Sequence, residues 1–201
     1  MAGIKKFFLM LTRPLVIPLV KLRVSPNLLT LTGFLVTLCA AWLYLSHPMW
    51  IAALVLLAAG LFDTLDGQVA RAGSRESLFG AFLDSVVDRL SEFAIFAALL
   101  WRFRDINWHF AIIFLSMSAS VMISYARARG EGLGLRTEAG PMPRAIRYFW
   151  IILASFLPPF WFILVMIPFA GLAWITVARR CRELYTFLSP LSAGSEDKER
   201  R

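Results

Sequence analysis

The chain has 201 residues, of which 59% are hydrophobic and 17% are charged, and its mean hydropathy is +0.68. A soluble domain is about half apolar and about one quarter charged, so this composition excludes an ordinary soluble protein and indicates one that lies in a bilayer. The net charge of +8 does not indicate a nucleic-acid-binding protein, because Lys and Arg stand at the ends of apolar segments and form no basic stripe with aromatic residues. The two cysteines, Cys39 and Cys181, have neither a paired framework nor metal-ligand spacing.

The first 24 residues predict an amphipathic helix that lies on the membrane surface. Lys5 and Lys6 before an apolar stretch resemble a signal peptide, but Pro14 and Pro18 interrupt that stretch and no small-x-small cleavage site follows. Apolar residues recur near helical spacing instead, as an interfacial helix requires. These residues are Ile4, Phe7, Phe8, Leu11 and Leu15.

Six apolar runs follow, and each is long enough or nearly long enough to cross a hydrocarbon core, which takes roughly 20 residues. The predicted spans are Leu28–Ser46, Met49–Ala70, Leu78–Trp101, Trp108–Ala126, Ala145–Leu157 and Phe160–Ala178. The fifth run is short, because Pro158 and Pro159 end it. The sequence therefore predicts an all-α, polytopic membrane protein with six transmembrane helices. It forms a single domain over residues 1–190, followed by a disordered, charged tail at 191–201.

The distribution of Lys and Arg predicts the orientation in the membrane. An even number of spans places both termini on one side, and the basic residues concentrate on the cytoplasmic side. The opposite side has only Arg102 and Arg104. Both termini, the loop after the second span and the long loop after the fourth span are therefore expected in the cytoplasm.

Four aspartates lie within or at the ends of the second and third apolar runs. Asp63 and Asp66 are three residues apart, and Asp84 and Asp88 are four apart, so each pair projects from one face of its helix. The short loop between the runs makes the two helices antiparallel neighbours, and all four carboxylates are expected to converge near the cytoplasmic end. Charged groups at membrane depth are costly and normally functional.

Arg71 and Arg89 are the cations close enough in sequence to neutralise these carboxylates. The remaining negative charge favours hard divalent cations, which take oxygen ligands. Helix caps or a buried set of salt bridges would be the structural alternative. Four aspartates at helical spacing favour the metal site.

The full pattern is Asp63-x2-Asp66-Gly67-x2-Ala70-Arg71-x8-Gly80-x3-Asp84-x3-Asp88, which places eight residues over 26 positions. It resembles, at every defining position and spacing, the signature of the CDP-alcohol phosphotransferase family. The segment Pro26-Asn27-x-Leu29-Thr30 is similar to the family's Pro-Asn-x-x-Thr segment. The resemblance implies six transmembrane helices, an interfacial N-terminal helix and a homodimer, in the cell membrane of a bacterium or archaeon.

The resemblance also implies a reaction and a set of site residues. The enzyme would move a phosphatidyl-type group from a CDP-linked lipid, such as CDP-diacylglycerol, to a small alcohol and release CMP. Two divalent ions, Mg²⁺ or Mn²⁺, would be held by Asp63, Asp66 and Asp84 with Asp88 beside them, and Asp88 would be the general base. The expected CDP-binding residues are Asp63, Asp66, Gly67, Ala70, Arg71, Gly80 and Asn27.

Elementary chemistry agrees with these roles. A pyrophosphate linkage breaks by in-line attack at phosphorus, and cations stabilise the charge that develops on the leaving CMP. An alcohol becomes a good nucleophile when a carboxylate takes its proton. Direct transfer without a covalent enzyme intermediate is therefore expected.

Arginines after the fourth span suggest an acceptor that carries its own phosphate, although they could equally be ordinary cytoplasmic charges. The expected acceptor-binding residues are Arg127, Arg129, Arg144 and Arg147. The Ser-Tyr-x-Arg-Ala-Arg-x-Glu pattern from Ser124 looks like the branch that makes phosphatidylinositol phosphate, with inositol phosphate as acceptor. Four positions depart from that branch, namely Arg127, Gly130, Pro143 and Ile146. Glycerol 3-phosphate is the alternative acceptor and serine the third.

A divalent-cation transporter is the non-enzymatic alternative, since intramembrane aspartates also line ion pathways. Transporters often have repeated halves and broken helices, and this sequence has neither. A membrane scaffold would not retain four costly carboxylates. The enzyme is therefore the preferred interpretation.

Overall fold

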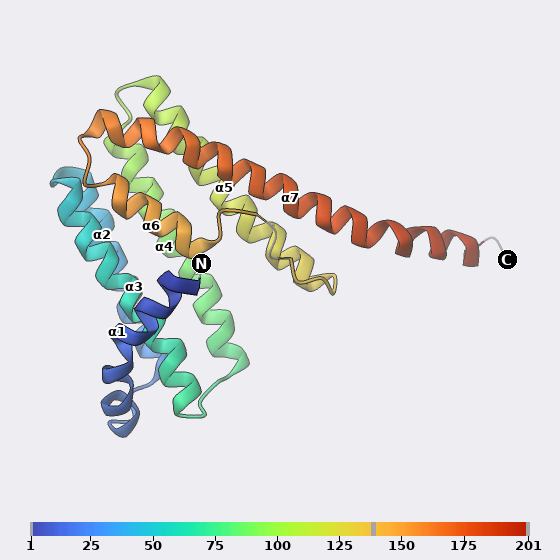
Figure 1. Ribbon diagram of the computed structural model, residues 1–201, viewed down its shortest axis with the longest axis horizontal. Coiled ribbons are helices and arrows are strands. Elements are labelled where there is room, and N and C mark those ends of the chain that lie inside the picture. Colours follow the sequence, from blue (N-terminus) through green and yellow to red (C-terminus); the bar gives the residue numbers. More distant parts are fainter. Residues whose placement is uncertain (1, 138–139, 200–201) are drawn as a thin grey trace. The chain divides into compact units, whose positions relative to one another are not determined.

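The computed structural model describes residues 2–137 and 140–199, with side chains for residues 12–137 and 140–189. Over these residues the chain is all-α, as predicted. Its helices are α1 Ala2–Lys21, α2 Pro26–Ser46, α3 Met49–Ala72, α4 Leu78–Arg102, α5 Asn107–Gly132, α6 Arg144–Ala154 and α7 Pro159–Glu199 (Figure 1). The chain forms two compact units, Met1–Phe103 and Arg104–Arg201. The single domain over 1–190 stays a prediction.

In the first unit, α2 packs against both α3 and α4. Proline at the first helical position starts α2, because Pro26 has no N–H to leave unpaired and its backbone is already set for a helix. Small residues then allow close approach. At Gly33, a Cβ atom would lie 2.9 Å from Cβ of Phe62 in α3, so only glycine fits this crossing.

Helix α1 packs against α3. Val16 lies in a cluster with Leu29, Leu65 and Val69, and the amide of Gln68 donates to the hydroxyl of Thr12. The apolar residues up to Leu11 that predicted an interfacial helix have side chains outside the described part of the chain. The helix is present, whereas its place on the membrane surface stays a prediction.

The loop between α3 and α4 is tied to the linker between α1 and α2. Nη1 of Arg75 donates to the carbonyl of Arg23 at 3.0 Å and lies 3.5 Å from that of Val24. Helix α4 begins after Ser77, whose hydroxyl accepts the N–H of Gly80 at 3.0 Å and so caps the helix. These contacts hold the ends of α2, α3 and α4 together.

Four helices in the described chain are long and apolar enough to cross a membrane, namely α2, α3, α5 and Pro159–Ser189 of α7. Six transmembrane helices are therefore confirmed only in part. Helix α4 has 25 residues, but Asp84, Asp88, Arg89 and Glu92 make it too charged for this class. Helix α6 has 11 residues and spans about 16 Å at 1.5 Å per residue, against a hydrocarbon core about 30 Å thick.

In the second unit, α5 and α6 both pack against α7. The segment before α6 is fastened to α7, because the N–H of Met142 donates to the hydroxyl of Thr176 at 3.2 Å and Thr137 donates to Glu183. Gly140 has φ +114, and a Cβ there would collide with Thr176. The predicted disordered tail, 191–201, falls where side chains lie outside the described residues, although α7 is assigned as helix to Glu199.

We expect Gly33→Ala to destabilise the protein and Gly60→Ala to leave it unchanged or slightly more stable. The added methyl group at position 33 meets Phe62, whereas nothing lies within 4 Å of a Cβ at Gly60. Overpacking costs about 1–3 kcal/mol, and alanine recovers roughly 0.5–1 kcal/mol in a helix. Thermal unfolding of both variants in one detergent measures the difference. Equal melting temperatures would contradict the close α2–α3 crossing.

Candidate active site

Three of the four motif aspartates come together at one point of the first unit. Carboxylate oxygens of Asp63 from α3 and of Asp84 and Asp88 from α4 all lie within 4.8 Å of one another. Asp63 is exposed, and the other two are half-buried. Three of the four carboxylates that the helical spacing predicts to converge therefore do so, and Asp66 lies outside this cluster.

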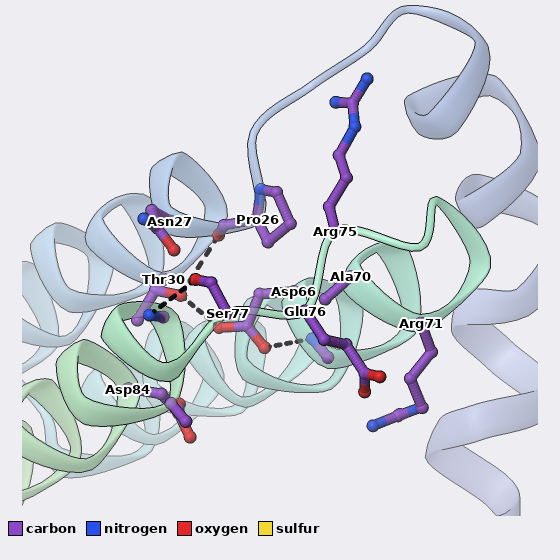
Figure 2. A pocket seen from close by; sticks show the side chains of 13 residues that line it. Pro26, Asn27, Thr30, Asp66, Ala70, Arg71, Arg75, Glu76, Ser77 and Asp84 are labelled. Carbon is purple, nitrogen blue, oxygen red and sulfur yellow. Dashed lines mark hydrogen bonds between the residues drawn. The ribbon is translucent and has the colours of Figure 1, made fainter.

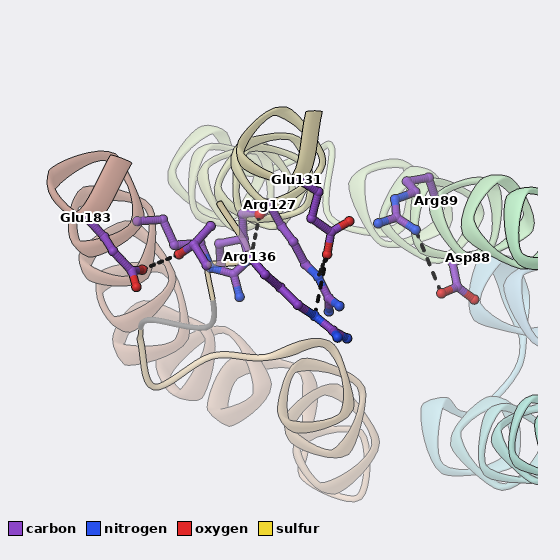
Figure 3. Close-up of polar contacts among 9 residues, drawn as sticks. Asp88, Arg89, Arg127, Glu131, Arg136 and Glu183 are labelled. Atoms are coloured by element: carbon purple, nitrogen blue, oxygen red, sulfur yellow. Dashed lines mark hydrogen bonds and ion pairs between the residues drawn. The ribbon is translucent and has the colours of Figure 1, made fainter. Parts of the chain in front are cut away.

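This cluster has the composition of a site for a hard divalent cation. Two unit negative charges about 5 Å apart repel by roughly 3 kcal/mol at an effective dielectric constant near 20. The side chain of Arg89 approaches the cluster at 3.9 Å from Asp88 (Figure 3) and also donates to the carbonyl of Ser85. Three carboxylates are ligands that Mg²⁺ and Mn²⁺ accept, so the residues present fit such an ion.

Asp66 differs from the other three aspartates. It is 6% exposed, its Oδ2 accepts the hydroxyl proton of Thr30 at 2.6 Å, and its Oδ1 accepts the N–H of Gly67. Asp66 is not a member of the three-residue cluster among the described side chains. Metal ligation by Asp66 therefore stays a prediction.

A pocket of about 220 Å³ opens beside Asp66 (Figure 2). Six of the seven predicted CDP-binding residues line it, and Asp63 is the exception. The lining residues are Pro26, Asn27, Thr30, Asp66, Gly67, Ala70, Arg71, Arg75, Glu76, Ser77, Gly80, Ala81 and Asp84. Because Asp84 belongs to both groups, the pocket adjoins the carboxylate cluster.

The two motif glycines keep this pocket open. A Cβ at Gly67 would lie 3.4 Å from Nη1 of Arg71, and a Cβ at Gly80 would lie 3.0 Å from Oγ of Ser77 and 3.2 Å from Oδ1 of Asn27. A Cβ at Gly80 would crowd Ser77 and Asn27, whereas a Cβ at Gly67 would be in ordinary contact with the guanidinium of Arg71. The capped N-terminus of α4 also lies here, and a helix N-terminus favours anions.

The predicted acceptor-binding arginines have unlike surroundings in the second unit. Nε of Arg127 pairs with Glu131 at 3.0 Å, and Nε of Arg136 lies 3.9 Å from the same carboxylate (Figure 3). Arg129 is exposed, and Arg144 lies over the ring of Tyr148 at 5.3 Å. The four residues do not share one environment, so their common role stays a prediction.

Arg147 is the most buried of these arginines, at 1% exposure. It donates to the carbonyl of Met142 at 3.0 Å and approaches the hydroxyl of Ser124 at 3.4 Å. Sequence reasoning missed a second buried guanidinium, that of Arg180 in α7, which donates to the carbonyl of Ile123 at 2.8 Å. Both therefore reach the same turn of α5. In the sequence, Arg180 was indistinguishable from the neighbouring cytoplasmic arginines, and its burial is the signal that separates it.

The sequence model of the CDP-alcohol phosphatidyltransferase family matches residues 23–187. That range includes every residue lining the pocket, the carboxylate cluster, and Arg127, Arg129, Arg144, Arg147 and Arg180. The chain belongs to the CDP-alcohol phosphatidyltransferase family, and it is therefore a transferase of phospholipid biosynthesis.

Comparison with named proteins indicates which members of the family this chain is similar to. Archaetidylinositol phosphate synthase of Pyrococcus horikoshii is 36% identical over 167 residues, which cover 82% of this chain and 86% of that protein. Phosphatidylinositol phosphate synthase of Mycobacterium tuberculosis with CDP-DAG bound superposes with a TM-score of 0.80 at 28% identity, covering 87% of this chain and 94% of that one. The same synthase in complex with manganese and citrate also gives a TM-score of 0.80 at 28% identity, covering 86% and 88%.

The predicted family and the prediction of an enzyme are confirmed by these findings. Family membership decides against the divalent-cation transporter and the membrane scaffold. Four apolar helices in the described chain agree with an integral membrane enzyme.

We expect Asp84→Asn to weaken Mn²⁺ binding about ten- to a hundred-fold, because losing one charge-assisted contact costs about 1.5–3 kcal/mol. Electron paramagnetic resonance of free Mn²⁺ during titration of the detergent-purified protein measures this affinity. Asp105→Asn is the matched control, since Asp105 makes a surface pair with Arg104 and is 80% exposed. Equal Mn²⁺ affinity in the two variants would argue against an ion at the carboxylate cluster.

Proposed function

We propose that the enzyme transfers the phosphatidyl group of CDP-diacylglycerol to inositol phosphate and releases CMP. The observation that carries this proposal is the pocket, which collects six of the residues expected to bind CDP and shares Asp84 with the carboxylate cluster. The names of the relatives, phosphatidylinositol phosphate synthase and archaetidylinositol phosphate synthase, support the acceptor.

Asp63, Asp66 and Asp84 would hold the divalent ions, Mg²⁺ or Mn²⁺ and two in number, with Asp88 beside them in the carboxylate cluster. The proximity of Asp63, Asp84 and Asp88 within 4.8 Å and the manganese complex of the mycobacterial synthase support this assignment. When bound, the cations would stabilise negative charge on the oxygens of the pyrophosphate.

The pocket residues would bind the cytidine diphosphate part of the donor. Arg71 offers a planar guanidinium that matches phosphate oxygens, and Gly67 and Ala70 leave the backbone beside it accessible. Asn27 lies over Gly80 at the start of α4, where backbone N–H groups favour phosphate. The CDP-DAG complex of the mycobacterial synthase supports this donor.

Asp88 would act as the general base. Its carboxylate is half-buried in the cluster and would take the hydroxyl proton of the acceptor. The acceptor oxygen then forms a bond to the phosphorus of the lipid phosphate, and the bond from that phosphorus to the bridging oxygen breaks. CMP leaves with that oxygen, so atoms and charge balance without a covalent enzyme intermediate.

Arginines of the second unit would bind the phosphate of the acceptor. The candidates are Arg127, Arg129, Arg144 and Arg147, together with the buried Arg180. Each guanidinium offers a planar set of donors that matches phosphate oxygens. Glycerol 3-phosphate, which also carries a phosphate, remains the second candidate.

In the membrane, α2 to α7 would provide six spans, with both termini and the site on the cytoplasmic side. Helix α4 would be the polar span, since its charged residues serve the site. The excess of Lys and Arg at the termini and in alternate loops supports this orientation. The functional assembly would be a homodimer.

Release of CMP from CDP-diacylglycerol, measured with a panel of acceptors, tests the proposal. We expect kcat/KM to be highest with inositol phosphate, lower with glycerol 3-phosphate and lowest with serine, and chelation of divalent cations to abolish all activity.

Arg144→Ala should raise KM for inositol phosphate about ten- to a hundred-fold with little effect on KM for the lipid. Arg104→Ala, which changes an exposed arginine in a surface pair, is the control. A preferred acceptor without a phosphate would overturn the acceptor assignment.

We expect Asp88→Asn to lower kcat about a hundred- to ten-thousand-fold, the usual contribution of a general base. The amide keeps the shape of the carboxylate and cannot take the proton. Affinity for CDP-diacylglycerol, measured by equilibrium binding in the presence of Mn²⁺, should stay close to wild type. A variant that binds metal and donor normally and turns over at the wild-type rate would exclude Asp88 as the base.

A further inference from the structure

Thr30 in α2 holds the carboxylate of Asp66 in α3. Thr30 is 8% exposed, and its hydroxyl oxygen lies 2.6 Å from Oδ2 of Asp66 and 3.2 Å from the carbonyl of Pro26. A hydroxyl has a single proton, and the contact with Asp66 at 2.6 Å is shorter than the contact with Pro26 at 3.2 Å. Thr30 therefore donates to Asp66.

The opposite oxygen of this carboxylate is also held. Oδ1 of Asp66 accepts the N–H of Gly67, so each oxygen receives a donor from the protein (Figure 2). Two donors at the two oxygens define the plane of the carboxylate, and each oxygen keeps further lone pairs. Asp66 lines the pocket and presents these lone pairs there in one orientation.

Apolar contacts between α2 and α3 lie on both sides of this hydrogen bond. Leu29, next to Thr30, lies in the apolar cluster with Leu65 and Val69. One turn further, Gly33 meets Phe62 in close contact. The apolar contacts on both sides of Thr30 set the register of the two helices. The hydroxyl of Thr30 takes no part in these contacts and donates to Asp66.

We propose that Thr30 is a positioning residue of the transferase site, which fixes the carboxylate of Asp66 for the divalent cation that accompanies the CDP-linked donor. The proposal rests on the proposed function. Thr30 acts through Asp66 and makes no contact with reacting groups in this role. It supplies a hydrogen-bond donor to a carboxylate that is 6% exposed, where an unpaired oxygen would be costly.

Three variants of α2 separate this role from a packing role. Thr30→Val removes the donor and keeps the branched shape, whereas Thr30→Ser keeps the donor and removes a methyl group. Thr32→Val is the matched control, because the hydroxyl of Thr32 donates to the carbonyl of Leu28 at 2.8 Å within its own helix. Thr30→Ala, which removes the same donor with a smaller side chain, replaces Thr30→Val if that variant does not fold.

The readouts are Mn²⁺ affinity by electron paramagnetic resonance, kcat/KM for CDP-diacylglycerol and the melting temperature in detergent. We expect Thr30→Val to lower Mn²⁺ affinity and kcat/KM by about ten- to a hundred-fold, the usual effect of losing a hydrogen bond to a charged group. Thr30→Ser should restore both quantities, and Thr32→Val should leave them unchanged.

The proposal would be overturned if the Thr30→Val variant melts at a lower temperature but keeps wild-type Mn²⁺ affinity and kcat/KM. That result would assign Thr30 to packing alone. Failure of Thr30→Ser to restore Mn²⁺ affinity would overturn it as well. The Mn²⁺ titration requires no substrate. It therefore decides on Thr30 even if CDP-diacylglycerol is not the donor, an outcome that would count against the proposed function alone.

Discussion

Contact of α2 with both α3 and α4 is the constraint on which the candidate active site depends. Asp63 and Asp66 belong to α3, Asp84 and Asp88 belong to α4, and α2 packs against both helices. The contact is close because Gly33 leaves no side chain between α2 and Phe62 of α3. Protein interiors are packed densely enough that one extra methyl group shifts its neighbours. Helix α2, which carries none of the four aspartates, therefore sets the spacing between the pair in α3 and the pair in α4.

The same site brings together negative charges that repel one another. Repulsion among three carboxylates within 4.8 Å raises the free energy of the folded protein unless solvent or a cation compensates their charges. The exposure of Asp63 and the half-burial of Asp84 and Asp88 reduce that cost. Asp66, the buried one, accepts hydrogen bonds from Thr30 and Gly67. The four motif aspartates therefore differ in their surroundings: three lie together and are at least partly exposed, whereas Asp66 is buried and hydrogen-bonded.

In the second unit, two arginines are buried, whereas others lie on the surface. Arg147 and Arg180 reach adjacent residues of α5, namely Ser124 and Ile123. Arg127, by contrast, is held in a surface pair with Glu131. Surface pairs contribute little to stability, whereas a buried guanidinium must find acceptors or an anion. The arginines that read alike in the sequence therefore have different physical roles.

The all-α class and the four most apolar spans were predictable from the sequence, as was the convergence of Asp63, Asp84 and Asp88, although Asp66 was expected to join them. These features follow from composition, from the length of apolar runs and from the 3.6-residue period of a helix, all of which are local. Only the tertiary structure decided that Thr30 meets Asp66, 36 residues away, and that Arg180 is buried against Ile123. Such contacts depend on the register between helices, and a register that is set by close packing at single positions such as Gly33 leaves no periodic pattern in the sequence.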